Sequence, residues 1–261
     1  MNLEEIKAFW EQAGQQIEES DRISPTSRDP YLGQLERENV LSFLGGRKRV
    51  LEIGCGDGAH TLHYARCVQK LSAMDVADSL IELAKKRMAD HQTTPVDFRV
   101  GSVLNLSSVY GQDQFDCIIT QRCLINLPEW ENQQEAIKEV HKVLEPGGLF
   151  LLTEGFEEEL NHLNKVRKSV HLPEIKVVPY NKNIVRKNFE SFIRPYFDTL
   201  EIRDYGTYLF LSRVFHPLAV LPDNPQHDSP LNKAAFELSH ALTIPQFQEY
   251  SYNLFYVLKK R

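Results

Sequence analysis

Residues 50–59 of the chain read VLEIGCGDGA, and this stretch decides the fold. A short apolar run at residues 49–53 predicts a β-strand. The three glycines that follow, Gly54, Gly56 and Gly58, predict a tight turn, because glycine adopts positive φ and lets a ligand approach the backbone. The next residues predict a helix, and the free N–H groups at a helix start favour an anionic ligand group. The stretch therefore predicts a strand–turn–helix unit that binds a ligand.

Short apolar runs and helical periodicity alternate along the rest of the chain. Before residue 155 the pattern predicts helices at 1–20, 31–44, 59–68, 79–91 and 131–144 and strands at 49–53, 70–75, 96–100, 115–120 and 149–153. Pro146, Gly147 and Gly148 are expected to end the last of these helices. After residue 155 it predicts helices at 156–170, 184–197, 208–220 (interrupted at Pro217) and 231–242, loops at 173–183 and 221–230, and strands at 199–205 and 250–258. Strands that alternate with helices are typical of a parallel sheet, which binds ligands beyond the carboxyl ends of its strands.

The glycine turn allows two interpretations. Gly54, Gly56 and Ala59 formally satisfy the dinucleotide fingerprint Gly-x-Gly-x-x-Gly/Ala. Glu52, however, would hold a carboxylate where a pyrophosphate would lie, and like charges repel. Gly58 makes the turn better suited to a smaller group, and no residues for hydride transfer follow. A NAD-dependent oxidoreductase therefore stays the alternative.

The segment from Glu52 to Gly58 resembles the first motif of class I S-adenosylmethionine-dependent methyltransferases, an acidic residue followed by x-Gly-x-Gly-x-Gly. Residues 70–75 (KLSAMD) resemble the second strand of that family, 115–119 (FDCII) its fourth strand, and 144–150 (LEPGGLF) the entry to its fifth strand. The resemblance covers residues 35–155 well and residues 198–261 weakly.

The resemblance implies an α/β, Rossmann-like fold: a mostly parallel, seven-stranded sheet with helices on both faces, plus a helical lid or insert. We expect four segments: an N-terminal helical cap at 1–45, a cofactor-binding core at 46–155, a substrate-covering insert with the sixth strand at 156–248, and a terminal strand at 249–261.

The resemblance also implies S-adenosyl-L-methionine as the cofactor. Gly54 and Gly56 would line its methionine part. Asp75 would accept hydrogen bonds from both ribose hydroxyls, and Val76 would lie against the adenine. The residues expected to contact the cofactor are Arg28, Tyr31, Glu52, Gly54, Cys55, Gly56, Asp75, Val76, Ser102, Val103 and Gln121.

One position departs from the family pattern. Members usually carry an acidic residue after the third strand to bind the adenine amine, whereas this chain has Ser102 followed by Val103. A catalytically silent cofactor-binding partner protein is therefore a further alternative. Arg28 and Tyr31 precede the core where some members fold a lid over the cofactor, and Arg28 could pair with the cofactor carboxylate.

The candidate catalytic residues are Arg122, which follows the fourth strand, and His216 in the C-terminal region. The Asn/Asp-Pro-Pro-Tyr signature of amino-methylases and the Pro-Cys nucleophile of cytosine methylases are missing, which argues against methylation of DNA bases. We expect methyl transfer to an oxygen or nitrogen of a small or medium substrate, such as a sugar, a glycan precursor or a secondary metabolite. The residues leave the substrate, the general base and the oligomeric state open.

Composition agrees with a folded enzyme that acts on a small molecule. The net charge of −6 argues against a large nucleic-acid footprint, which needs clustered Lys and Arg. The four cysteines form no Cys-x-x-Cys pair, so no metal site is expected. The sequence contains neither a signal-peptide pattern nor an apolar run long enough to span a membrane, and a cytoplasmic location is the expectation.

Overall fold

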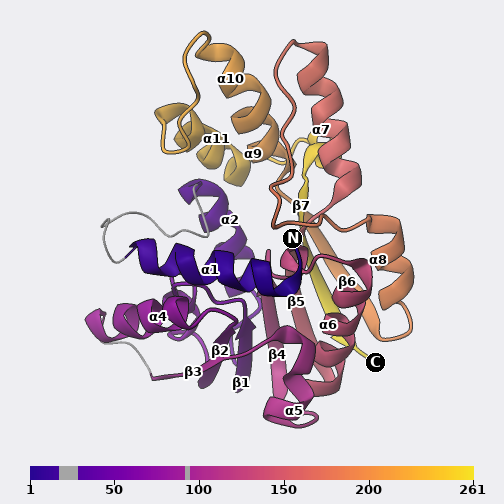
Figure 1. Cartoon of the computed structure of the whole chain (residues 1–261). Coiled ribbons are helices and arrows are strands. Elements are labelled where there is room, and N and C mark those ends of the chain that lie inside the picture. Colours follow the sequence, from indigo (N-terminus) through magenta and orange to yellow (C-terminus); the bar gives the residue numbers. More distant parts are fainter. Residues whose placement is uncertain (18–28, 92–94) are drawn as a thin grey trace.

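Seven strands form one sheet in a computed structural model that describes residues 1–17, 29–91 and 95–261 (Figure 1). The strands are β1 (Arg49–Ile53), β2 (Lys70–Asp75), β3 (Val96–Val100), β4 (Phe115–Gln121), β5 (Leu144–Gly155), β6 (Phe197–Asp204) and β7 (Asn253–Lys260), in the order β3-β2-β1-β4-β5-β7-β6. Strands β1 to β5 pair in parallel, and β7 runs antiparallel between β5 and β6. The predicted α/β fold with a mostly parallel, seven-stranded sheet is confirmed.

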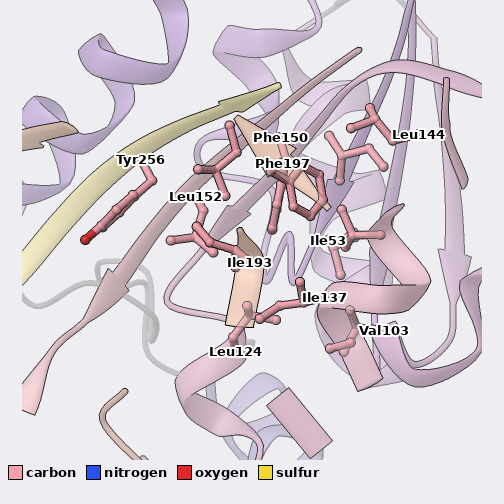
Figure 2. Packing of buried hydrophobic residues seen from close by; sticks show 14 of the residues in the cluster. Ile53, Val103, Leu124, Ile137, Leu144, Phe150, Leu152, Ile193, Phe197 and Tyr256 are labelled. Carbon is pink, nitrogen blue, oxygen red and sulfur yellow. The ribbon is translucent and has the colours of Figure 1, made fainter. Parts of the chain in front are cut away.

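Helices cover both faces of the sheet. The first face packs against α2 (Pro30–Leu41), α3 (Thr61–Tyr64), α4 (Asp78–Asp90), α9 (Gly206–Phe210) and α11 (Pro230–Ala241). The second face packs against α5 (Leu106–Tyr110), α6 (Trp130–Val143) and α8 (Arg186–Ile193). Figure 2 shows the core on the second face, where Ile137 and Ile193 meet Phe150 and Leu152 of β5.

Neighbouring residues of the central strands enter opposite cores because side chains alternate along a strand. In β4, Ile118 is buried in one core while Cys117 and Ile119 are buried in the other. Strands that are covered on both faces need continuous apolar runs, which is the pattern the sequence carries at 115–120.

The start of β5 differs from the expectation. Pro146, Gly147 and Gly148 were expected to lie between a helix and a strand, but β5 already begins at Leu144, which pairs with Phe115. The register then shifts, so that Cys117 pairs with Leu149. The Pro-Gly-Gly segment is thus a bulge inside the strand, and Gly147 adopts a positive φ of 77° there.

The predicted helix at 208–220 is interrupted in the expected region, but by a widened turn. Residues 211–215 form a π-helical turn between α9 and α10 (His216–Ala219). Pro217 has no N–H to donate to the carbonyl group of Arg213, four residues earlier. The guanidinium group of Arg167, from α7 (Glu157–Ser169), donates to that carbonyl instead.

Helix α1 (Leu3–Ile17) packs against α4 and lies across the carboxyl ends of the strands (Figure 1). The hydroxyl group of Ser79 donates to the carbonyl group of Glu11 at 2.8 Å. A Cβ atom on Gly14 would lie 2.3 Å from Ser79 Oγ, so this close approach needs glycine. In the part of the chain that the structure describes, every helix is too short or too polar to span a bilayer.

Candidate active site

A cavity of about 1120 Å³ lies at the carboxyl ends of the parallel strands. It collects most of the residues predicted for the site, namely Glu52, Gly54, Cys55, Gly56, Asp75, Val76, Ser102, Val103, Gln121 and Arg122. Tyr31 and His216 do not line it, and Arg28 lies outside the described residues. The residues come from the ends of β1, β2, β3 and β4, as expected for the ligand edge of a parallel sheet.

The glycine turn lets the end of β1 lie close to the end of β4. Gly54, Gly56 and Gly58 have φ values of 72°, 54° and 74°, in the left-handed region that favours glycine. A Cβ atom on Gly54 would lie 2.9 Å from Cys123 Sγ. The turn therefore exposes backbone to the cavity where a side chain would close it.

Asp75 ends β2 with its carboxylate held by the backbone. Oδ2 accepts a hydrogen bond from the N–H of Gly56 at 2.9 Å, and Oδ1 accepts one from the N–H of Ala77 at 3.0 Å. Burial raises the pKa of Asp75, and these backbone hydrogen bonds oppose the rise. A carboxylate has about four acceptor positions, so two remain for a ligand such as a vicinal diol.

Glu52 lies beneath the turn and is 4% exposed. Burial raises the pKa of Glu52 to about 8, and the negative charge of Asp75 adds to this rise. The hydroxyl of Thr61, which donates to Oε2 at 2.6 Å, opposes the rise. A cationic ligand group beside Glu52 would lower this pKa again. The environment therefore suits an ammonium group better than a phosphate.

The side chain of Gln121, at the end of β4, joins two residues of the first helical segment. Its Oε1 accepts a hydrogen bond from the hydroxyl of Tyr64 at 2.6 Å and lies 3.0 Å from Nδ1 of His60. Burial lowers the pKa of His60 to about 3, and the charges of Arg122 and Arg37 add to the effect. His60 is therefore neutral at physiological pH. Gln121 Nε2 is buried without a described partner, which leaves its two N–H donors for a ligand.

The remaining wall comes from α1 and the segment 175–183. Trp10 Nε1 donates to Oδ1 of Asn126 at 2.6 Å, and Asn126 Nδ2 donates to Oδ1 of Asn181 at 3.1 Å. The ring of Phe9 stacks on Tyr180 with centroids 4.3 Å apart. These contacts join the two segments over the cavity.

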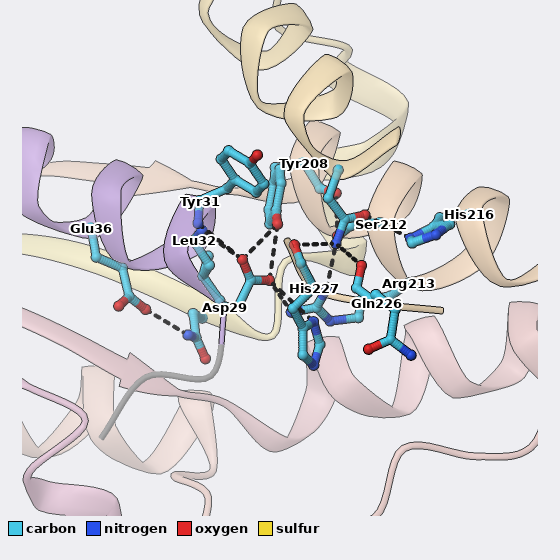
Figure 3. Close-up of polar contacts among 12 residues, drawn as sticks. Asp29, Tyr31, Leu32, Glu36, Tyr208, Ser212, Arg213, His216, Gln226 and His227 are labelled. Carbon is cyan, nitrogen blue, oxygen red and sulfur yellow. Dashed lines mark hydrogen bonds and ion pairs between the residues drawn. The ribbon is translucent and has the colours of Figure 1, made fainter. Parts of the chain in front are cut away.

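A second polar cluster lies where α2 meets the C-terminal helices (Figure 3). Asp29 caps α2 and accepts hydrogen bonds from the hydroxyl of Tyr208 at 2.7 Å and from Arg213 at 2.5 Å. Asp29, Arg213 and His227 line the cavity. His216 lies outside it because its side chain is buried in the helical segment, with Nδ1 2.8 Å from Oδ1 of Asn232.

The sequence-based prediction missed several cavity residues. Phe9, Trp10 and Tyr180 are not among the residues predicted for the site, yet all three line the cavity. Arg213 and His227 gave no local signal, because they reach the cavity through packing between segments far apart in the sequence. His60 is not among the predicted site residues either, although its position two residues after Gly58 could have indicated the cavity.

Comparison with known proteins adds to this geometry. The family model described as "Methyltransferase domain" matches residues 50–148, which hold the glycine turn, Asp75 and Gln121. Residues 50–148 are a class I methyltransferase domain. The domain implies S-adenosyl-L-methionine as the cofactor, and the buried Asp75 carboxylate, the glycine turn and the unpartnered Gln121 Nε2 fit that molecule.

Relatives with this domain differ in how much of the chain they cover. The uncharacterized methyltransferase YcgJ of Bacillus subtilis is 31% identical over 48% of this chain and 51% of its own length. The uncharacterized methyltransferase C1B3.06c of Schizosaccharomyces pombe is 23% identical over 76% of this chain and 79% of its own. This chain thus spans about half the length of the first of these relatives.

The fold extends beyond the matched domain. The structure of N-methyltransferase NodS from Bradyrhizobium japonicum, in complex with S-adenosyl-L-homocysteine, is similar with a TM-score of 0.57 over 97% of this chain and 98% of that one, at 15% identity. PH0226 from Pyrococcus horikoshii is similar with a TM-score of 0.59 over 91% and 94%, also at 15% identity. At such identity the likeness establishes the fold alone.

Proposed function

We propose that this protein transfers the methyl group of S-adenosylmethionine to an oxygen or nitrogen of a small or medium acceptor enclosed in the cavity. The observation that carries the proposal is that Asp75, the glycine turn and Gln121 line one cavity at the ligand edge of the sheet. When bound, the cofactor supplies a methyl group on a sulfonium, so the protein mainly has to orient the acceptor and exclude water.

In this proposal the cofactor lies over β3, β2 and β1. Asp75 accepts hydrogen bonds from the ribose hydroxyls with its two remaining acceptor positions. Val76 and Val103 border the adenine, and Ser102 takes the place of the usual acid. Ser102 Oγ already accepts a hydrogen bond from the N–H of Leu104 at 3.2 Å, so it keeps limited capacity for the adenine amine.

The methionine part would occupy the space between the glycine turn and the end of β4. Glu52 is a buried acid that lines this space, and the positive charge of an ammonium group would favour its ionised form. Gln121 Nε2 offers an unsatisfied donor on the other side. Tyr31, whose ring packs on Phe236 with centroids 5.6 Å apart, would support α2 rather than contact the cofactor.

The acceptor would lie over β4, β5 and β7, under α1 and the segment 156–248. We assign α1 and this segment the roles of a cap and a substrate cover, because Phe9, Trp10 and Tyr180 meet over the cavity. Exclusion of water there would protect the reacting groups and strengthen electrostatic interactions.

His60 is the proposed hydrogen-bond acceptor that orients the nucleophile, because its pKa of about 3 keeps the ring neutral. With Gln121 Oε1 facing Nδ1, that nitrogen carries the ring proton, and Nε2 keeps its lone pair. Nε2 would accept a hydrogen bond from the hydroxyl or amine group of the acceptor and hold that group toward the methyl donor, and a proton released from it would pass on to solvent. Tyr64 would hold Gln121, and thereby the ring, in this orientation.

A methyl-transfer assay tests the proposal. The chain is incubated with S-adenosylmethionine labelled in the methyl group and with a panel of sugars, phenols, amines and hydroxy acids. We expect label transfer to at least one acceptor, and a loss of about tenfold in kcat for His60→Gln, as expected for one orienting hydrogen bond. His63→Gln, three residues along the same segment, is the matched control and should keep wild-type activity. No transfer to any acceptor despite tight cofactor binding would instead support a non-catalytic cofactor-binding partner.

A further inference from the structure

The guanidinium group of Arg122 lines the cavity without forming a hydrogen bond to any described residue. Its Nε is buried and unpartnered, and the nearest carboxylate oxygen, Glu36 Oε2, lies 3.4 Å from Nη2. That separation exceeds the 2.7–3.2 Å range of ordinary N–H···O hydrogen bonds. A guanidinium has five donors in a planar fork, so Arg122 is well short of satisfied.

The backbone at Arg122 holds an unfavourable conformation. Its φ is 53°, in the left-handed region that non-glycine residues seldom adopt, and its N–H donates to the carbonyl of Thr153 at 2.7 Å. Such conformations cluster at ligand sites, where the surrounding structure maintains them. Here the conformation accompanies a side chain that borders the cavity.

Glu36 is an incomplete counterion for Arg122. It is fully buried on α2, and its Oε1 accepts a hydrogen bond from Nδ2 of Asn253 at 2.8 Å, while Oε2 has no hydrogen-bond partner. Burial raises the pKa of Glu36, although the charge of Arg122 opposes the rise. The pair therefore keeps two groups of opposite charge near each other without the hydrogen bonds that normally stabilise a buried ion pair.

Arg122 lies apart from the positions predicted for the ribose and the adenine. Its neighbour Glu36 is hydrogen-bonded to Asn253, the first residue of β7. Asp75, in contrast, ends β2, and Ser102 follows β3, at the other side of the sheet. The same half of the cavity is lined by Lys176 and Arg213. Arg213 forms an ion pair with Asp29, whereas Arg122 keeps a buried donor without a partner among the described residues.

We propose that Arg122 binds a carboxylate of the acceptor, which replaces Glu36 as the partner of its guanidinium group. The inference rests on the proposed function and names its substrate class: a molecule that carries a carboxylate near its oxygen or nitrogen nucleophile. A planar carboxylate matches the guanidinium fork, and one such group balances one positive charge. The apolar lining from Leu160, Ile175 and Val177 would contact the rest of the acceptor.

Calorimetric titration tests this without knowledge of the natural acceptor. The protein is first saturated with S-adenosylhomocysteine and then titrated with benzoate, with benzamide as the neutral control of equal shape, and with phenyl phosphate. We expect benzoate to bind and benzamide not to bind. Arg122→Gln should weaken the binding of benzoate by about tenfold or more, because the variant loses a charge-assisted hydrogen bond. Arg49→Gln, at an exposed ion pair with Glu145, is the matched control and should change nothing.

Glu36→Gln separates ligand binding from a structural role. If Glu36 competes for Arg122, this variant should bind benzoate several-fold more tightly, because the amide keeps the acceptor for Asn253 and removes the competing charge. Arg122→Gln should leave the affinity for S-adenosylhomocysteine within twofold of wild type.

Three results would overturn the inference. The first is equal binding of benzoate and benzamide, and the second is binding of phenyl phosphate alone. The third is that Arg122→Gln weakens the binding of S-adenosylhomocysteine but not that of methylthioadenosine, which lacks the amino acid part. The last result would assign Arg122 to the cofactor carboxylate. Failure of the wild-type protein to bind S-adenosylhomocysteine would overturn the proposed function itself.

Discussion

Replacement of Asp75 by Asn isolates the hydrogen bonds proposed for the ribose. The two carboxylate oxygens already accept the N–H groups of Gly56 and Ala77, which leaves one acceptor position on each oxygen for a hydroxyl. Asparagine keeps the size of the side chain but offers one oxygen and no charge. The variant therefore loses one charge-assisted hydrogen bond and weakens the other.

A hydrogen bond to a charged group contributes about 1.5–3 kcal/mol, so we expect Asp75→Asn to bind S-adenosylhomocysteine about 10- to 150-fold more weakly. The assay is isothermal titration calorimetry at constant ionic strength. Asp78→Asn, an exposed acid three residues along the chain in the first turn of α4, is the matched control. It should leave the affinity unchanged.

Asp75 also holds the turn through Gly56, so a ligand without ribose hydroxyls is needed to separate the two effects. For 2′,3′-dideoxy-S-adenosylhomocysteine the wild-type protein and Asp75→Asn should bind with nearly equal affinity. Equal losses for both ligands would refute the reasoning, because Asp75 would then act only on the turn. Unchanged affinity for S-adenosylhomocysteine would remove Asp75 from the site altogether.

Three further changes test other parts of the structure. Gly54→Ala should destabilise the protein by about 1–3 kcal/mol in chemical denaturation, because its positive φ and the 2.9 Å approach to Cys123 both oppose a Cβ atom; a stability equal to wild type would contradict the described turn. His60 has an ordinary pKa of 6.5 and a folded-state pKa of about 3, so in this range only the unfolded state takes up the proton. Stability should therefore fall as pH drops from 6.5 toward 4, by up to about 1 kcal/mol per pH unit, and His60→Gln should flatten this dependence in denaturation at several pH values; the same slope in both proteins would mean that His60 is not buried as described. Trp10→Phe removes the donor to Asn126 and should speed dissociation of S-adenosylhomocysteine several-fold in stopped-flow measurements; an unchanged rate would show that α1 does not close the cavity.

The parallel sheet and the ligand edge could be predicted from the sequence because their signals are local. The glycine turn after β1 and the acid that ends β2 follow from short patterns, and Gly54 and Asp75 line the same cavity. The apolar runs of the central strands likewise reflect burial on both faces, which needs no knowledge of distant residues.

The rest of the site depends on contacts between distant segments. Trp10 and Tyr180 are 170 residues apart in the sequence, yet the centroids of their rings lie 5.3 Å apart. No local pattern specifies that contact. His216 was a candidate because of its chemistry, but packing against Asn232 places it outside the cavity. Arg122 was identified from its position after β4, while its incomplete pairing with Glu36 required coordinates.

Titration of the wild-type protein with S-adenosylhomocysteine and, separately, with NAD⁺ tests most directly whether the cavity at the ends of β1, β2 and β4 holds the methyl-donor cofactor. We predict that S-adenosylhomocysteine binds with a stoichiometry of about one and that NAD⁺ releases no heat of binding, because the buried acid Glu52 offers a pyrophosphate no positive counter-charge. Binding of NAD⁺ with no response to S-adenosylhomocysteine would contradict the assignment and point to an oxidoreductase.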